Sequence, residues 1–173
     1  MEIKGQGFTL RGWKTDDALA LQRNADNSKI YACVLDLFPH PYTMKHAVEW
    51  VSMMMTQDPL LVFVIDVAGE LAGVVGITMR NDVYRKAPLI GYWLGEAHWG
   101  RGIVTQAVKL VVDYAFANLD IMRLQAGVFS CNPASMRVLE KAGFVKEGIA
   151  RSAIIKNGVV LDEHCYGLVK SEP

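Results

Sequence analysis

The stretch GYWLGEAHWGRGIVTQAV (residues 91–108) places two glycines and an arginine directly before a segment with helical apolar spacing. Glycine is a poor helix former, so Gly100 and Gly102 do not serve to extend that helix. Their lack of a Cβ atom lets the backbone approach a ligand closely. A helix N-terminus offers unpaired N–H groups and a partial positive charge, and phosphate groups commonly bind there. The stretch therefore predicts an anion-binding turn between a strand and a helix.

Two familiar phosphate loops fit this stretch poorly. A Walker loop requires GxxxxGK followed by Ser or Thr, and GRGIVT contains no such lysine. A dinucleotide fingerprint requires GxGxxG in the first strand-to-helix turn, whereas here the third glycine is missing and the preceding strand lies mid-chain. A plain structural interpretation also stays open at this point, in which the glycines only make a tight turn.

Size and composition are those of a soluble globular protein, and we expect one domain over residues 1–173. Of the 173 residues, 51% are hydrophobic and 21% charged, and the formal net charge is zero. This neutral balance argues against nucleic acid as the main partner. Three cysteines without CxxC spacing are typical of reduced thiols in a cytosolic protein. No apolar run approaches the ~20 residues of a membrane helix, and the N-terminus lacks a signal-peptide core. We therefore expect a cytoplasmic location without a membrane partner.

Apolar periodicity and turn signals predict a mixed α/β order of elements. Strands are predicted over residues 8–13, 60–67, 71–79, 89–94 and 122–129, helices over 15–27, 44–57, 102–118 and 132–143, and a closing hairpin around Asn157–Gly158. The strand–helix steps imply at least one parallel pair, with Leu89–Leu94 beside Leu124–Phe129. The rest of the sheet is expected to be antiparallel, so the fold class is α/β with a mixed sheet.

Caps and apolar faces are predicted for the helices as well. Thr15 or Asp16 is expected to cap the first helix and Thr43 the second. The second helix is expected to bury Ala47, Val48, Val51, Met54 and Met55. The helix after the glycines is expected to bury Val104, Val108, Val111, Val112 and Ala115.

Several further stretches accompany the glycine turn in a fixed order along the chain. TLRGWKTDDA opens the chain, IGYWL precedes WGRGIVTQA, NPASMRVLEKAGF and EKAGFVKEGIAR follow it, and LDEHCYGL closes the chain. This order resembles the GNAT superfamily of acyl-CoA-dependent N-acetyltransferases, and within it the RimJ/RimL-like branch of ribosomal-protein acetyltransferases. The resemblance covers nearly the full length. It implies a GNAT-like fold, with a mostly antiparallel twisted sheet, flanking helices and one splayed parallel strand pair.

The resemblance implies that backbone N–H groups of the glycine turn hold the pyrophosphate of acetyl-CoA. The family motif Q/R-x-x-G-x-G/A maps onto Trp99, Gly102 and Val104, so this chain departs from it at the first and last positions. Strand Gly91–Gly95 is expected to pair with the pantetheine arm, and a backbone N–H near Leu94 to polarise the thioester carbonyl. The expected cofactor-binding residues are Trp93, Leu94, Gly95, Trp99, Gly100, Arg101, Gly102, Ile103, Val104, Thr105, Asn132 and Ser135.

Asn132 and Ser135 match the N-x-x-S motif of the family and are the expected catalytic residues. The resemblance implies that Asn132 orients the pantetheine arm and that Ser135 protonates the leaving thiolate. Asn132 also fits an ordinary helix cap before Pro133, and the two roles are compatible. Candidates by residue type for the general base are Glu96, His98, Asp162, Glu163 and His164, and proton loss through water is an equal alternative. A covalent route through Cys131 has no basic partner of defined spacing to support it.

The resemblance places the acceptor-binding wall in YACVLDLFPHPYT (residues 31–43). Tyr31, Phe38 and Tyr42 are its expected contacts, with His40 and Trp50 as further aromatic candidates. The expected acceptor is a primary amine, either a protein N-terminus such as that of a ribosomal protein or a small amine. The histidines lack HExxH-like spacing, so no metal is expected. A homodimer is one open assembly. A non-catalytic acyl-CoA-binding sensor or partner domain of the same fold stays open as the alternative function.

Overall fold

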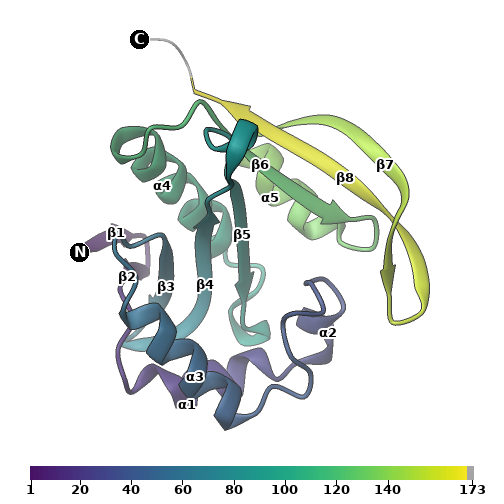
Figure 1. Cartoon of the computed structure of the whole chain (residues 1–173). Coiled ribbons are helices and arrows are strands. Elements are labelled where there is room, and N and C mark those ends of the chain that lie inside the picture. The colour runs from purple at the N-terminus through teal and green to yellow at the C-terminus, as the bar shows by residue number, and fades with distance from the viewer. Residues whose placement is uncertain (171–173) are drawn as a thin grey trace.

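The structure is a computed structural model that describes residues 1–170. One twisted sheet carries helices on both faces, as Figure 1 shows. Its strands are β1 (Glu2–Gly5), β2 (Phe8–Arg11), β3 (Val62–Val67), β4 (Glu70–Thr78), β5 (Leu89–Leu94), β6 (Arg123–Phe129), β7 (Val145–Lys156) and β8 (Val159–Val169). Its helices are α1 (Asp17–Ala25), α2 (Ser28–Tyr31), α3 (Met44–Met55), α4 (Ile103–Asn118) and α5 (Pro133–Lys141), with 3-10 turns at Asp82–Tyr84 and Glu96–His98. Within residues 1–170, no helix is both long and apolar enough to cross a membrane.

The eight strands lie in the order β1-β2-β3-β4-β5-β6-β8-β7. Among the described residues, β5 and β6 form the one parallel neighbour pair, and their ladder consists of Leu89 with Gln125. Past this pair the two strands diverge, and we call the space between them the β5–β6 gap. The structure thus confirms the expected mixed sheet with a splayed parallel pair.

Two apolar clusters hold the helices to the sheet. The larger cluster fills the face under α4 and α5, and includes Val108, Val111 and Leu139. The smaller cluster fills the opposite face under α1 and α3, and includes Leu21 and Val51. In Figure 1 these two helix layers lie on either side of the strands, and the long β7–β8 hairpin forms one edge of the sheet. The two faces of the sheet beside the β5–β6 gap are therefore covered by different apolar clusters.

A buried ion network connects β2, β3 and the start of α1. Arg11 Nε lies 2.6 Å from Asp66 Oδ2, and an Arg11 terminal nitrogen lies 2.7 Å from Asp17 Oδ1. All three residues are almost fully enclosed, with 4%, 9% and 4% exposure for Arg11, Asp66 and Asp17. This network explains a correction to the sequence analysis. Neither Thr15 nor Asp16 caps α1 with its side chain, and the nearby carboxylate of Asp17 binds Arg11 and the Lys14 N–H instead.

The second helix confirms its predicted cap but not its full apolar face. Thr43 accepts a hydrogen bond from His46 N–H in a reciprocal capping box. Val48 and Met55 were expected to be buried, but each is 50% exposed. Both lie beside the stripe of α3 that packs on the sheet. Their hydrophobicity alone does not show whether their side chains face the sheet or the solvent. Strand β1 and the short helix α2 were not predicted, because four-residue elements carry little periodic signal.

Candidate active site

The glycine loop, residues 99–102, leaves the first turn of α4 open. Gly100 and Gly102 adopt φ angles of 73° and 75°, and a Cβ atom on either would meet no atom within 4 Å. In the described part of the chain, no side chain caps this helix. The first backbone bond into it runs from Gln106 N to Gly102 O, at 3.2 Å. The N–H groups of the preceding turn are thus available to an external acceptor.

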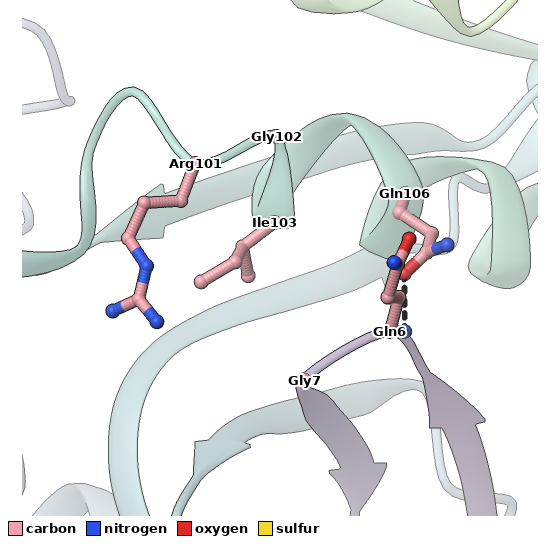
Figure 2. Close-up of a pocket in the computed structure, with 6 residues that line it drawn as sticks. All are labelled: Gln6, Gly7, Arg101, Gly102, Ile103 and Gln106. Atoms are coloured by element: carbon pink, nitrogen blue, oxygen red, sulfur yellow. Dashed lines mark hydrogen bonds between the residues drawn. The ribbon is translucent and has the colours of Figure 1, made fainter.

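A pocket of about 390 Å³ opens over this loop, lined by Gln6, Gly7, Arg101, Gly102, Ile103 and Gln106. Figure 2 shows Arg101 and Ile103 extending from the loop to the same side, with the β1–β2 turn approaching α4 beside them. The Gln6 N–H donates to Gln106 Oε1 at 2.6 Å and so holds that turn against the helix. Sequence reasoning missed Gln6 and Gly7, because nothing local indicates that this turn meets a helix about a hundred positions away. Val104 packs against the core, so the departure from the family motif there leaves the loop open.

The edge of β5 presents backbone groups to the β5–β6 gap. The Gly95 N–H donates to Ala72 O on β4 at 2.8 Å, so Gly95 faces β4. Backbone groups of successive strand residues point to opposite sides. The N–H and C=O of Leu94 therefore face the gap. Trp99 Nε1 donates to Leu94 O at 2.7 Å, which ties the glycine loop to the end of β5 and leaves the Leu94 N–H toward the gap.

The first turn of α5 brings Asn132 and Ser135 to the other side of the gap. Asn132 Oδ1 accepts a hydrogen bond from Ser135 N at 3.1 Å, which confirms the predicted cap. The Ser135 hydroxyl lies 2.8 Å from the Tyr92 hydroxyl, a contact that bridges from β5 to α5. Sequence reasoning missed Tyr92. Strand alternation places it on the α5 side of β5, but no local signal names its partner.

Trp93 lies with aromatic residues on the opposite face of the sheet. Its ring centroid is 5.8 Å from that of Phe38, and Phe38 is 5.0 Å from Tyr42. Tyr42 is only 4% exposed, and burial raises its pKa to about 12. The expected contact of Trp93 with the cofactor stays a prediction, and the Trp93 side chain follows that of Tyr92 in the strand and so points away from α5. We therefore group Trp93 with the 31–43 segment.

The end of β7 anchors the 31–43 segment. Lys156 is 4% exposed, its Nζ atom lies 2.7 Å from Asp36 Oδ1, and it sits 3.5 Å above the ring of Tyr31. Tyr31 also stacks on His40 at 4.7 Å. Trp50 does not join this group and packs edge-on against Trp13, at 6.5 Å. The anchor is therefore a lysine from the far end of the chain.

Replacing Lys156 with methionine is expected to loosen the 31–43 segment. The change removes both the ion pair and the cation–π contact, so amide hydrogen exchange across residues 31–40 should accelerate about tenfold. Exchange in α4 should stay unchanged. Lys45→Met is the matched control, because its exposed ion pair with Glu49 spans 3.8 Å on the helix surface. Equal exchange in the parent and the Lys156 variant would show that the lysine is not an anchor.

Two of the five base candidates lie between β5 and the glycine loop. Glu96 is paired with Lys29 and accepts from Asn27 Nδ2 at 2.8 Å. The hydrogen bond from Lys29 lowers the pKa of Glu96, and the hydrogen bond from Asn27 lowers it further. Burial lowers the pKa of His98, and the charge of Arg101 adds to this effect.

The other three base candidates lie on β8. Asp162 accepts a hydrogen bond from Ser152 N at 2.8 Å and so closes the hairpin. His164 has a buried Nδ1 without a hydrogen-bond partner in the described residues. The Glu163 carboxylate lies against Gly127 of β6, where any Cβ atom would overlap it. Gly127 alternates with the residues that pack under α4 and α5, so Glu163 lies on the same face as Trp93. The Glu163 carboxylate therefore covers β6, the strand that borders the gap, on the face that carries Trp93.

Cys131 and Cys33 are neighbours. Burial raises the pKa of the Cys33 thiol, and the adjacent Cys131 adds to this effect. The contact joins the 31–43 segment to the residue that precedes Asn132. Across residues 1–170, no three His, Cys, Asp or Glu side chains gather as metal ligands.

Comparison with known proteins decides the family. The family model described as an acetyltransferase (GNAT) domain matches residues 8–145 of the chain. The chain belongs to the GNAT acetyltransferase family. Its sequence is 54% identical to that of the probable N-acetyltransferase YjcK of Bacillus subtilis over 103 residues, which are 60% of this chain and 57% of YjcK.

Other GNAT proteins extend the comparison. The ribosomal-protein-serine acetyltransferase of Escherichia coli is 31% identical over 107 residues, or 62% of this chain and 59% of that protein. The chain thus spans less than two thirds of the length of these curated relatives. The crystal structure of the microcin C7 self immunity acetyltransferase MccE in complex with acetyl-CoA and AMP is 27% identical. It has a TM-score of 0.78 over 96% of this chain and 94% of that one.

Proposed function

We propose that the protein is an acetyl-CoA-dependent N-acetyltransferase that transfers the acetyl group directly from the thioester to a primary amine. The observation that carries this proposal is the uncapped N-terminus of α4, which opens on the pocket of about 390 Å³. One tryptophan, Trp99, links this loop to the Leu94 carbonyl at the β5–β6 gap. Membership of the GNAT family supports the proposal, as does the MccE complex with acetyl-CoA.

The residues fit a coenzyme with a diphosphate. Gly100 and Gly102 leave open space where a Cβ would intrude, and the free N–H groups of the first turn suit an anion. Arg101 lines the same pocket and adds a positive charge. Backbone N–H groups of residues 100–105 would hold the diphosphate, as the sequence predicted.

Acetyl-CoA would supply an activated acetyl thioester, and the chain would supply the groups around it. The Leu94 N–H faces the gap and donates to the carbonyl oxygen as negative charge develops there. Asn132 holds the first turn of α5 through the Ser135 N–H. The Ser135 hydroxyl donates a hydrogen bond to the departing sulfur and so stabilises the negative charge that forms there.

The acceptor side is the face with Trp93, Phe38 and Tyr31. The aromatic rings form an apolar wall, and the Glu163 carboxylate adds a negative charge that attracts an ammonium group. A protein N-terminus and a small amine both carry the required primary amine. The E. coli relatives named for a ribosomal-protein serine and for spermidine support both kinds of acceptor.

A screen of amines tests the function. Thiol release from acetyl-CoA is measured with peptides that reproduce ribosomal-protein N-termini and with small amines, including polyamines. We expect release above the amine-free rate with at least one acceptor, and mass spectrometry should find the acetylated amine. Tight coenzyme binding in calorimetry without release from any acceptor would favour the non-catalytic sensor domain.

Replacing Ser135 with alanine is expected to lower kcat by about 10- to 100-fold, because a serine hydroxyl is a weak acid whose loss removes one stabilising donor. The acetyl-CoA dissociation constant should stay within about twofold, since the loop contacts remain. Steady-state kinetics and calorimetry check the two values. Ser52→Ala, at an exposed position of α3, is the control. Full turnover in Ser135→Ala would remove this residue from the mechanism.

A further inference from the structure

Tyr92 joins the two sides of the β5–β6 gap. It lies three positions after Leu89, the last β5 residue paired with β6. Its hydroxyl lies 2.8 Å from Ser135 Oγ and 3.2 Å from the Ser135 carbonyl oxygen. Its ring packs against the core under α4 and α5. Both polar neighbours of the phenol are therefore atoms of one residue, Ser135.

This geometry gives the phenol proton two alternative acceptors. When Tyr92 donates to the Ser135 carbonyl, the 2.8 Å contact between the two hydroxyls is a hydrogen bond only if Ser135 donates back to the phenol oxygen. When Tyr92 donates to Ser135 Oγ, the Ser135 hydrogen is free to point to a third atom. The position of one proton thus decides whether Ser135 is available to a ligand in the gap.

We propose that Tyr92 is a positioning residue, whose phenol donates to Ser135 Oγ and directs the Ser135 hydroxyl to the sulfur that leaves during acetyl transfer. This inference rests on the proposed function. In that step the amine nitrogen forms the amide bond and gives one proton to water. The C–S bond breaks with its electron pair on sulfur, and a proton from water then converts the thiolate to the thiol. Tyr92 and Ser135 lower the barrier by hydrogen bonding and keep their own protons.

Burial keeps the Tyr92 phenol protonated, and therefore a hydrogen-bond donor, over the pH range in which the enzyme is assayed. Burial raises the pKa of Tyr92 to about 12, although its hydrogen bond with Ser135 acts in the other direction. A thiol ionises near pH ~8.5, so the phenol is still protonated where the departing sulfur is an anion. It remains a donor and does not transfer its proton. The pH profile of kcat should therefore show no decline from Tyr92 between pH 7 and pH 10.

Tyr92→Phe removes the hydroxyl and keeps the ring. We expect kcat to fall about tenfold, as for the loss of one hydrogen bond, with KM for acetyl-CoA within about twofold. In a Ser135→Ala background the same change should have no further effect on kcat, because the residue acts through Ser135. A merely structural role would give independent, multiplying losses in the two backgrounds.

Tyr114→Phe is the matched control. Its hydroxyl donates to Leu60 O at 3.2 Å and its ring packs edge-on against Phe63, in the core away from the gap. This variant should lose thermal stability to a similar degree as Tyr92→Phe but keep the parent kcat. Parent-like kcat in Tyr92→Phe, or equal losses in both tyrosine variants, would overturn the proposal.

A binding measurement separates this inference from the proposed function. Calorimetry at pH 9 compares free coenzyme A, whose thiol is then largely ionised, with acetyl-CoA, whose sulfur carries no charge. Tyr92→Phe should weaken coenzyme A by about tenfold and leave acetyl-CoA unchanged. Equal affinities for coenzyme A in the parent and the variant overturn the positioning role. An enzyme inactive with every amine would contradict the proposed function alone, and this comparison would still decide the role of Tyr92.

Discussion

Replacing Arg11 with methionine is expected to lower the free energy of unfolding by about 3–5 kcal/mol, because removing one partner of a buried network leaves uncompensated charge. Asp17 and Asp66 would remain enclosed, at 4% and 9% exposure, without their cation. Methionine occupies a comparable length, so the loss reflects charge more than volume. For a domain of this size the melting temperature should fall by about 6–20 °C. Urea titration and thermal unfolding measure both quantities.

Arg23→Met is the control for the Arg11 variant. Arg23 pairs with Glu70 at 2.8 Å, but the two side chains are 59% and 66% exposed. Ion pairs at such positions contribute about 0–1 kcal/mol, and salt screens them. A loss below about 1 kcal/mol for Arg11→Met, equal to that of Arg23→Met, would show that the buried network adds no more than a surface pair.

Replacing Gly102 with alanine is expected to weaken acetyl-CoA binding by about 100-fold, as for the loss of two charge-assisted hydrogen bonds. Gly102 has a φ angle of 75°, which L-residues with a Cβ adopt only at a cost of about 1–2 kcal/mol. The new methyl group would also project into the open space above the loop. Relaxing the backbone would turn the first N–H groups of α4 away from the diphosphate. Calorimetry with acetyl-CoA gives the dissociation constant.

Gly69→Ala separates backbone strain from binding. Gly69 lies in the β3–β4 turn with a φ angle of 91°, and a Cβ atom added there would meet no atom within 4 Å, as at Gly102. Both variants should lose about 1 kcal/mol of stability, but only Gly102→Ala should lose affinity. Parent-like affinity in Gly102→Ala would mean that the diphosphate binds elsewhere, and the proposed function would lose its main support.

Local backbone requirements were readable from the sequence. Asn132 caps α5 as predicted, because a short polar side chain before proline has few other uses at a helix start. Asn157 and Gly158 both have positive φ angles, as the predicted hairpin turn demands. Gly100 and Gly102 likewise adopt left-handed conformations. Each of these signals depends only on neighbours in the chain.

Contacts between distant segments were not readable. The Tyr92–Ser135 bond depends on where two strands diverge, and the Gln6–Gln106 bond depends on the distance between a turn and a helix. The contact between Trp93 and Phe38 likewise depends on which face of β5 carries the Trp93 side chain. Side-chain direction follows from pairing and register, which a single sequence leaves undetermined.

The anchor of the 31–43 segment has a consequence for synthesis of the protein. Lys156 and Asp36 are 120 positions apart, and the lysine lies in the last hairpin. A chain emerging from the ribosome exposes its N-terminal portion first. The glycine loop and α4 therefore leave the ribosome before the lysine that fixes the 31–43 segment. An unfinished chain that stops short of Lys156 would contain the glycine loop and α4 but lack the cation that holds Tyr31 and Asp36.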